Sequence, residues 1–106
     1  MDMFQINYDS PANLYFIGIG GISMSAFAEL LCSKGFHIKG SDSHESAITR
    51  HLESLGIDVF YGQKADNIPG DTDLVVYTAA ISEDNPEYAE AVRRGLPMMV
   101  RAEMIG

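Results

Sequence analysis

The chain has one cysteine, no tryptophan, and only seven Lys and Arg residues against 15 Asp and Glu residues. Its single cysteine, Cys32, excludes an internal disulfide. No apolar run approaches the length of a membrane span. The first four residues lack the basic and apolar regions of a signal peptide. We therefore expect a cytoplasmic protein with no membrane partner.

The shortage of basic residues gives a formal net charge of −8. This charge repels nucleic acids and anionic membranes over most of the surface, so we expect neither as a partner. A single phosphate group can still bind, because a helix N-terminus supplies N–H donors and a partial positive charge locally. With 106 residues, the chain is long enough for one domain and too short for two.

Patterns of metal binding and of catalysis are also missing. His37, His44 and His51 show no metal-ligand spacing, and we interpret them as surface or packing residues. No set of Ser, His and Asp and no pair of catalytic carboxylates can be identified. The sequence therefore predicts no metal site and no catalytic residue in this chain.

What the chain does have is a regular alternation of strand-like and helical patterns. We interpret residues 1–12 as an N-terminal arm and 13–106 as one domain. The alternation predicts an α/β fold: a Rossmann-like, doubly wound, parallel five-stranded sheet of order 3-2-1-4-5 with helices on both faces. Strands are expected at 13–17, 36–39, 57–61, 74–78 and 96–100. Helices are expected at 22–33, 46–55 and 86–94, and a further helical turn from 101.

The first predicted strand leads into a glycine loop and then into the first helix. Strand, glycine turn and helix N-terminus are how α/β proteins bind a phosphate or diphosphate. The first glycine allows the turn, and at the second a Cβ would collide with the anion. The third position of the dinucleotide fingerprint is Ser rather than Gly, which weakens an NAD interpretation. The predicted diphosphate site consists of Gly18, Gly20, Gly21, Ile22, Ser23 and Met24.

Alternatives remain open for this loop. The glycines could form a tight turn that binds no ligand. Ser23 and Ser25 could either begin the helix or donate hydroxyl hydrogen bonds to phosphate oxygens.

Two further segments are expected at the same edge of the sheet. Ser41 and Asp42 stand about 20 residues beyond the glycine loop, where a ribose-binding acid is expected. Asp42 could instead form a capping box with Glu45. The loop after the fourth strand should face the glycine loop across the topological switch point and line the site, unless its alanines are small only because the turn is crowded. Its candidate residues are Thr78, Ala79 and Ala80.

Acidic residues surround the start of the last predicted helix. We interpret them as a solvated helix N-terminus; they are Glu83, Asp84, Glu87 and Glu90.

A resemblance to a known family rests on five segments: 16–25 (FIGIGGISMS), 40–42 (GSD), 52–56 (LESLG), 80–87 (AISEDNPE) and 101–104 (RAEM). In this order and spacing they resemble the N-terminal domain of the Mur ligase family, in the branch that joins L-alanine to UDP-N-acetylmuramate in peptidoglycan synthesis. The resemblance covers nearly the whole chain from Asn13 onward. The chain departs from it at Ser23, where the family usually has Gly, and at Gln63, where it often has His.

The resemblance implies a division of labour among three domains. The first binds the UDP moiety of UDP-N-acetylmuramate, the central one holds ATP and Mg²⁺, and the third positions the amino acid. The reaction is expected to form an acyl phosphate on the muramate carboxylate, from which the alanine amine displaces phosphate. Because this chain lacks the motif G-x-x-x-x-G-K-[ST], we expect it to bind substrate without ATP and to be inactive alone.

Three other functions stay open at this point. The related ligase that reattaches recycled peptides to UDP-N-acetylmuramate shares the domain type, although its glycine loop departs further from Gly-Ile-Gly-Gly. The others are a NAD-binding Rossmann domain of an oxidoreductase and a stand-alone nucleotide-sensing module.

Overall fold

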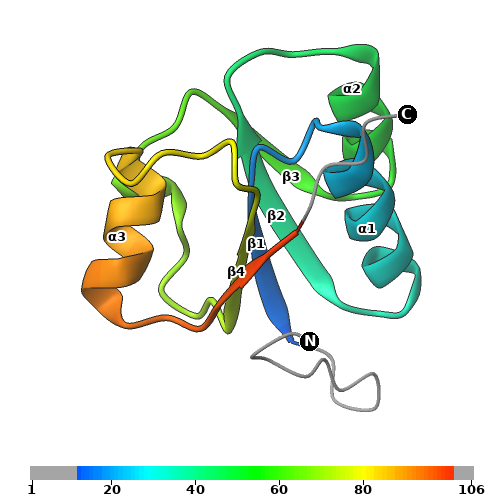
Figure 1. The fold of residues 1–106 in the computed structure, drawn as a ribbon. Coiled ribbons are helices and arrows are strands. Elements are labelled where there is room, and N and C mark those ends of the chain that lie inside the picture. The colour runs from blue at the N-terminus through cyan, green and yellow to red at the C-terminus, as the bar shows by residue number, and fades with distance from the viewer. Residues whose placement is uncertain (1–11, 102–106) are drawn as a thin grey trace.

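A computed structural model describes residues 12–101 as one five-stranded sheet flanked by helices (Figure 1). All strand pairs are parallel and the strand order is β3-β2-β1-β4-β5, as the sequence predicts. The elements are β1 (Asn13–Ile17), α1 (Ile22–Ser33), β2 (His37–Asp42), α2 (Ala47–Ser54), β3 (Asp58–Tyr61), the short 3₁₀ helix η1 (Ala65–Asn67), β4 (Leu74–Tyr77), α3 (Pro86–Arg94) and β5 (Met98–Val100).

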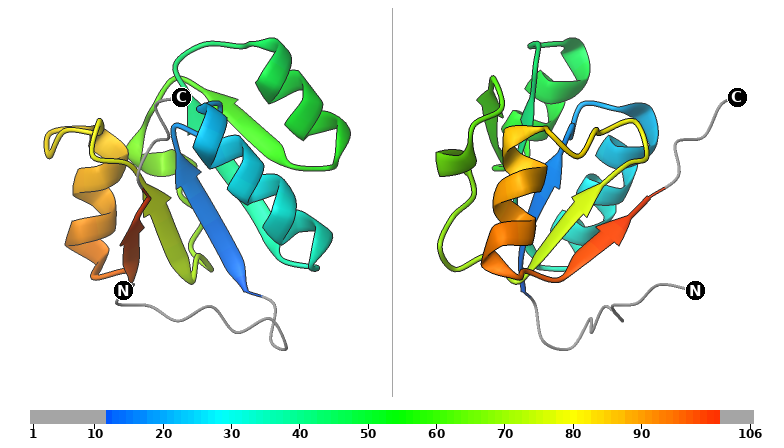
Figure 2. Two further views of the ribbon diagram at one scale, coloured as in Figure 1. Left: turned by 45° about the vertical axis from the view of Figure 1, so that its right-hand side comes forward. Right: turned by 60° about the vertical axis from the view of Figure 1, so that its left-hand side comes forward.

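Helices cover both faces of the sheet, which confirms the doubly wound arrangement. Helices α1 and α2 lie together on one face, and α3 lies on the other (Figure 2). Each face of the sheet has a hydrophobic core, and alternate residues of β1 belong to the two cores. Leu14 and Phe16 pack with α1 and α2, and Tyr15 and Ile17 pack on the side of α3. The two central strands, β1 and β4, are therefore buried on both faces, as expected for strands at the centre of a parallel sheet.

Two of the three α-helices begin at a side-chain cap. Ser46 and Thr49 form a capping box at α2, and the Asn85 side chain accepts hydrogen bonds from two backbone N–H groups of α3. Helix α1 differs, because its N-cap residue is Gly21 and no side chain caps it. Its first turn contains no acidic residue either, so the positive end of this helix dipole meets no capping side chain or first-turn acid of its own helix.

Strand β2 is longer than predicted and corrects one interpretation. It runs to Asp42 rather than ending at Lys39, so Ser41 and Asp42 are its last two residues and pair with Phe60 and Tyr61 of β3. The proposed capping box of Asp42 and Glu45 is wrong, because Ser46 and Thr49 cap α2. The sequence misled because glycine in a strand interior weakens strand propensity.

That glycine, Gly40, has a packing reason to be there. A Cβ at this position would lie 2.7 Å from the Phe16 carbonyl oxygen of β1 and 2.8 Å from Ile19 Cδ1. Ile19, which follows β1, is fully buried over β2 at this point. Gly40 therefore makes room for the residue that leads the chain from β1 into the glycine loop.

Some predictions fall at the ends of the chain. The N-terminal arm, 1–12, lies outside the described residues except for Ala12, and the helical turn expected from 101 lies outside them except for Arg101. Strand β5 is shorter than the predicted 96–100. Among residues 12–101, no helix is long and apolar enough to cross a membrane, and no group of three or more His, Cys, Asp and Glu side chains is placed to hold a metal ion.

Candidate functional site

The glycine loop lies at the carboxyl end of β1 and is tied to the end of β2. The backbone N–H groups of Gly18 and Ile19 both donate to the Ser41 carbonyl oxygen, at 2.9 and 2.8 Å. Gly18 has a φ of +81°, a conformation that residues with a Cβ rarely adopt. The sequence-based reason for the first glycine is therefore confirmed: it makes the turn that aims the chain into α1.

Asp42 occupies the space beside the second glycine. Its Oδ2 accepts a hydrogen bond of 2.8 Å from the Gly20 N–H. A Cβ on Gly20 would lie 2.7 Å from that same oxygen and 3.0 Å from Cγ2 of Thr49. Gly20 thus lacks a side chain because Asp42 and α2 approach it, and this constraint exists before any ligand binds.

The backbone of Asp42 is fixed as well. Its carbonyl oxygen accepts the N–H of Gly62, which follows β3, at 2.9 Å. Its Oδ1 accepts a longer bond of 3.3 Å from the His44 N–H. The half-buried carboxylate therefore stands at the carboxyl edge of the sheet, between the glycine loop and the loop after β3, where the sequence predicts a ribose-binding acid.

The start of α1 forms the rest of the predicted diphosphate site. Ser23 and Met24 are buried, whereas the Ile22 side chain is 73% exposed. The backbone at this N-terminus carries the positive end of the helix dipole, which favours an anion. The burial of Ser23 shows that α1 packs closely on the sheet even though the third fingerprint position is not glycine.

The loop after β4 meets the glycine loop, as predicted from the topology. A Cβ built on Gly18 would lie 3.9 Å from Ile81 Cδ1, so the two loops lie close together across the switch point. Thr78 is buried, whereas Ala79 and Ala80 are exposed. A crowded turn does not explain the two alanines, because their side chains face open space.

Ser41 is brought to this edge but in a different role from the predicted one. It is fully buried, and its hydroxyl donates to Glu87 Oε1 at 2.5 Å. Glu87 itself is fully buried, so its interpretation as part of a solvated helix start is wrong. The partners that bury it lie far away in sequence, 46 and 72 residues for Ser41 and Tyr15, which no local pattern indicates.

Gln63 is also held in place. Its Oε1 accepts a 2.6 Å hydrogen bond from Nδ2 of Asn85, while Oδ1 of Asn85 caps α3. The loop after β3 is thus joined to the N-terminus of α3. Gln63 is one of the two positions at which the chain departs from the family resemblance, and its side-chain oxygen already accepts a hydrogen bond within the fold.

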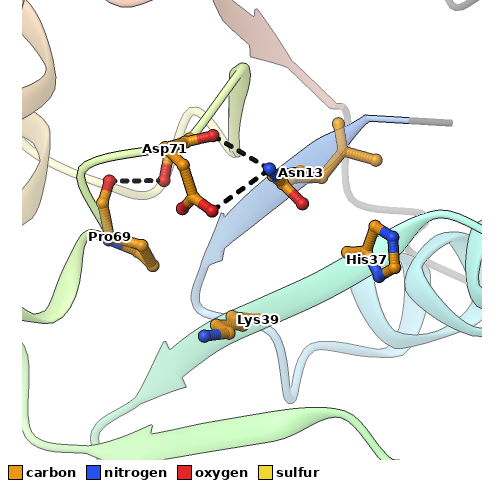
Figure 3. A pocket seen from close by; sticks show the side chains of 7 residues that line it. Asn13, His37, Lys39, Pro69 and Asp71 are labelled. Carbon is orange, nitrogen blue, oxygen red and sulfur yellow. Dashed lines mark hydrogen bonds between the residues drawn. The ribbon is translucent and has the colours of Figure 1, made fainter.

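A separate pocket of about 250 Å³ opens at the opposite edge of the sheet, where β1 and β2 begin (Figure 3). Asn13 closes one side of it through hydrogen bonds from Nδ2 to the carbonyl oxygen and to Oδ2 of Asp71. Ligands of open parallel sheets bind at the carboxyl ends of strands, so this pocket is not part of the candidate site. It is lined by Asn13, Leu14, His37, Lys39, Pro69, Asp71 and Thr72.

A parallel sheet with a glycine loop after β1, an acid at the end of β2 and helices on both faces defines a Rossmann-like α/β domain. Comparison with known proteins gives the family: the family described as "Mur ligase family, catalytic domain" matches residues 13–106. The chain belongs to the Mur ligase family.

Two relatives with high sequence identity are UDP-N-acetylmuramate–L-alanine ligases. The chain is 57% identical to that of Agathobacter rectalis over 98% of its own length and 23% of the relative's. The crystal structure of the ligase MurC from Thermotoga maritima matches with a TM-score of 0.80 and 42% identity, over 84% of this chain and 20% of that one. The chain spans less than a quarter of the length of these relatives.

A peptide ligase of the same family is similar at a lower level. The UDP-N-acetylmuramate:L-alanyl-γ-D-glutamyl-meso-diaminopimelate ligase from Neisseria meningitidis has a TM-score of 0.78 and 27% identity, over 86% of this chain and 29% of that one. Both structures share the fold. The higher identity favours the L-alanine branch of the family.

Proposed function

We propose that this chain binds the UDP moiety of UDP-N-acetylmuramate as the N-terminal part of an ATP-dependent ligase that adds L-alanine in peptidoglycan synthesis. One observation carries the proposal: the Asp42 carboxylate accepts the N–H of Gly20, which lies just before the uncapped N-terminus of α1. A nucleoside diphosphate needs these two features side by side, an acid for its ribose or base and a helix N-terminus for its phosphates.

Each group has a defined task in this proposal. Backbone N–H groups in the first turn of α1 donate to diphosphate oxygens, while the glycine at position 20 lets Asp42 approach. The Asp42 carboxylate accepts hydrogen bonds from ribose hydroxyls or the uracil N–H. The exposed alanines at 79 and 80 leave room for the rest of the substrate. Ser41 supports the glycine loop through its carbonyl oxygen, and its hydroxyl is occupied by Glu87.

ATP and Mg²⁺ belong to the rest of the enzyme in this proposal. The sequence has no phosphate-binding motif for ATP, and residues 12–101 offer no acidic cluster for a metal ion. The chain itself orients the substrate and carries out no chemical step. Such a ligase works in the cytoplasm, where its nucleotide substrates are made.

A calorimetric titration of the 106-residue chain tests the proposal. We expect UDP-N-acetylmuramate and UDP to bind, and ADP and NAD to bind at least about tenfold more weakly when Asp42 accepts the uracil N–H, which adenine nucleotides lack. Tighter binding of NAD would overturn the proposal in favour of an oxidoreductase domain. Equal affinity for all four ligands would reduce the site to an unspecific anion-binding loop.

The peptide-recycling ligase remains the second candidate, since the Neisseria enzyme shares the fold. The two candidates use the same uridine nucleotide, so binding does not separate them. The full-length protein does: the proposal requires ADP release with L-alanine, and the alternative requires it with the tripeptide.

A further inference from the structure

Glu87 is a buried carboxylate at the second residue of α3, and four donors surround it. Oε1 accepts the hydroxyl of Ser41. Oε2 accepts the Tyr15 hydroxyl at 2.9 Å, the Lys64 backbone N–H at 3.2 Å and Nδ2 of Asn67 at 2.8 Å. None of the ion pairs found among residues 12–101 involves Glu87. A buried carboxylate without a cation is costly unless it is fully hydrogen-bonded, so these four bonds act as a unit.

The protonation state of the Tyr15 hydroxyl supports its assignment as a donor to Glu87. Burial is the largest cause that raises the pKa of Tyr15 far above its ordinary value, and the nearby Glu87 carboxylate adds to it. The phenol is therefore protonated at neutral pH and donates to Glu87. The cluster ties β1, β2, α3 and the connection after β3 to one side chain.

One route of hydrogen bonds runs from Glu87 to the beginning of the glycine loop. Glu87 holds Ser41 by its hydroxyl, and the carbonyl oxygen of Ser41 accepts the N–H groups of Gly18 and Ile19. Displacement of Ser41 would move both acceptor bonds together. The first half of the loop is therefore set by a residue on the opposite face of the sheet from α1.

A second route reaches Gly20 through Asn67, Gly62 and Asp42. Asn67 donates from Nδ2 both to Glu87 and to the Gly62 carbonyl oxygen, at 2.8 and 2.9 Å. The N–H of Gly62 donates to the Asp42 carbonyl oxygen, and the Asp42 carboxylate accepts the Gly20 N–H. Both routes start at Glu87, and they end at residues 18–19 and at residue 20.

We infer that Glu87 is a positioning residue for nucleotide binding: it fixes the glycine loop and Asp42 in the geometry that receives a nucleoside diphosphate. The inference rests on the proposed function and adds to it a residue that touches no ligand. Its side chain lies on the α3 face, whereas the phosphates would lie at the N-terminus of α1. Its effect is carried entirely by Ser41 and by Asn67.

Two variants separate the routes. Glu87→Gln keeps the size of the side chain, removes its negative charge and leaves one acceptor oxygen where the carboxylate has two. Asn67→Ala cuts only the route through Gly62 and Asp42. Asn13→Ala is the matched control, because it also removes one Asn side chain with two Nδ2 hydrogen bonds, at the opposite edge of the sheet.

The measurements are the dissociation constants of UDP and inorganic pyrophosphate, the backbone amide resonances of residues 18–20 without ligand, and the melting temperature. We expect Glu87→Gln to weaken UDP and pyrophosphate by about tenfold, as loss of a hydrogen bond to a charged group does. The amides of Gly18, Ile19 and Gly20 should all shift. Asn67→Ala should weaken UDP and shift Gly20, with Gly18 and Ile19 unchanged. Asn13→Ala should bind as the unchanged chain does.

The outcomes distinguish the inference from the proposed function. Suppose that the unchanged chain binds UDP and that Glu87→Gln and Asn67→Ala bind it as tightly as Asn13→Ala does. Glu87 then has no positioning role, and the proposed function stands. If the unchanged chain binds no UDP, the proposed function fails and the inference fails with it. Should Glu87→Gln not fold, Asn67→Ala against Asn13→Ala decides the question alone.

Discussion

At the scale of single residues, two of the three glycines in the loop are required for different reasons. Gly18 adopts a positive φ that a side chain would strain, while Gly20 leaves room for Asp42 and Thr49. The sequence motif predicts that both positions need glycine, but it explains the need at Gly20 by the ligand alone. Asp42 fills that space from β2, 22 residues further along the chain. A local motif cannot show such a contact.

Gly20→Ala should therefore act through Asp42. The new Cβ would lie 2.7 Å from Oδ2, so the carboxylate must move and its bond to the Gly20 N–H must break. We expect the free energy of unfolding to fall by about 1–3 kcal/mol, as in other overpacked sites, and UDP affinity to fall by at least about tenfold. Gly70→Ala is the control, because nothing lies within 4 Å of a Cβ there. An unchanged UDP affinity in folded Gly20→Ala protein would contradict the assignment.

Asp42→Ala should weaken the binding of UDP but not the binding of pyrophosphate. Loss of the carboxylate removes a hydrogen-bond acceptor for the nucleoside, so UDP binding should weaken by about 1.5–3 kcal/mol. It also releases the Gly20 N–H and removes a negative charge beside the anion site, so pyrophosphate binding should not weaken. Calorimetry with both ligands checks this, with Asp58→Ala on β3 as an exposed control. An equal loss for both ligands would exclude a nucleoside-specific role.

At the scale of elements, how well the sequence predicts the structure depends on how local the cause is. The bounds of β1 and α1 are predicted to the residue because apolar periodicity and glycine punctuation are local. The end of β2 is not predicted, because Gly40 indicates a strand break in the sequence. Only the structure shows that Ile19 packs against this position. The topology predicts that the loops after β1 and β4 meet, and the position of Ile81 close to Gly18 confirms it. Glu87 could not be predicted as buried, because its partners come from β1, β2 and the connection after β3.

The loop after β4 allows a test of which loops line the site. Ala80 is exposed, so Ala80→Leu should leave the melting temperature nearly unchanged. If the loop lines the substrate site, affinity for UDP-N-acetylmuramate should fall by about tenfold or more. Ala89→Leu, at an exposed position of α3, is the matched control. Unchanged affinity in Ala80→Leu protein would confine the site to the loops after β1 and β2.

The C-terminal half of α3 should contribute stability that depends on pH. Hydrogen bonds from Arg93, and next from Arg94, lower the pKa of Glu90 to about 2. Because the folded value lies below the unfolded value of about 4.3, the contribution is present above pH 4.3 and is lost as the pH falls through 2. Thermal melts of the unchanged chain and Glu90→Gln should therefore differ at pH 7 and converge between pH 4 and 2. A difference that stays constant with pH would refute this origin; Glu83→Gln, in the exposed loop before α3, serves as control.

At the scale of the whole molecule, the net charge of −8 opposes the compact state. The folded domain concentrates these charges on one small surface, while the unfolded chain spreads them. We expect the melting temperature to rise as NaCl increases from 10 to 150 mM, because the Debye length shortens from about 30 to about 8 Å and screens the repulsion. A melting temperature that falls over this range would show that ion pairs such as that of Lys39 and Asp58 outweigh the repulsion.

Gly40 has a consequence for how substitutions in this domain would be interpreted. Any side chain there meets the Phe16 carbonyl oxygen and Ile19, both of which belong to the path into the glycine loop. In a saturation library selected for nucleotide binding, position 40 should be as depleted of variants as position 18, although it touches no phosphate. A ranking of positions by mutational tolerance alone would then wrongly assign Gly40 to the binding site. Sorting the same library by expression level identifies position 40 as a packing position, because variants that fail by packing also lose folded protein.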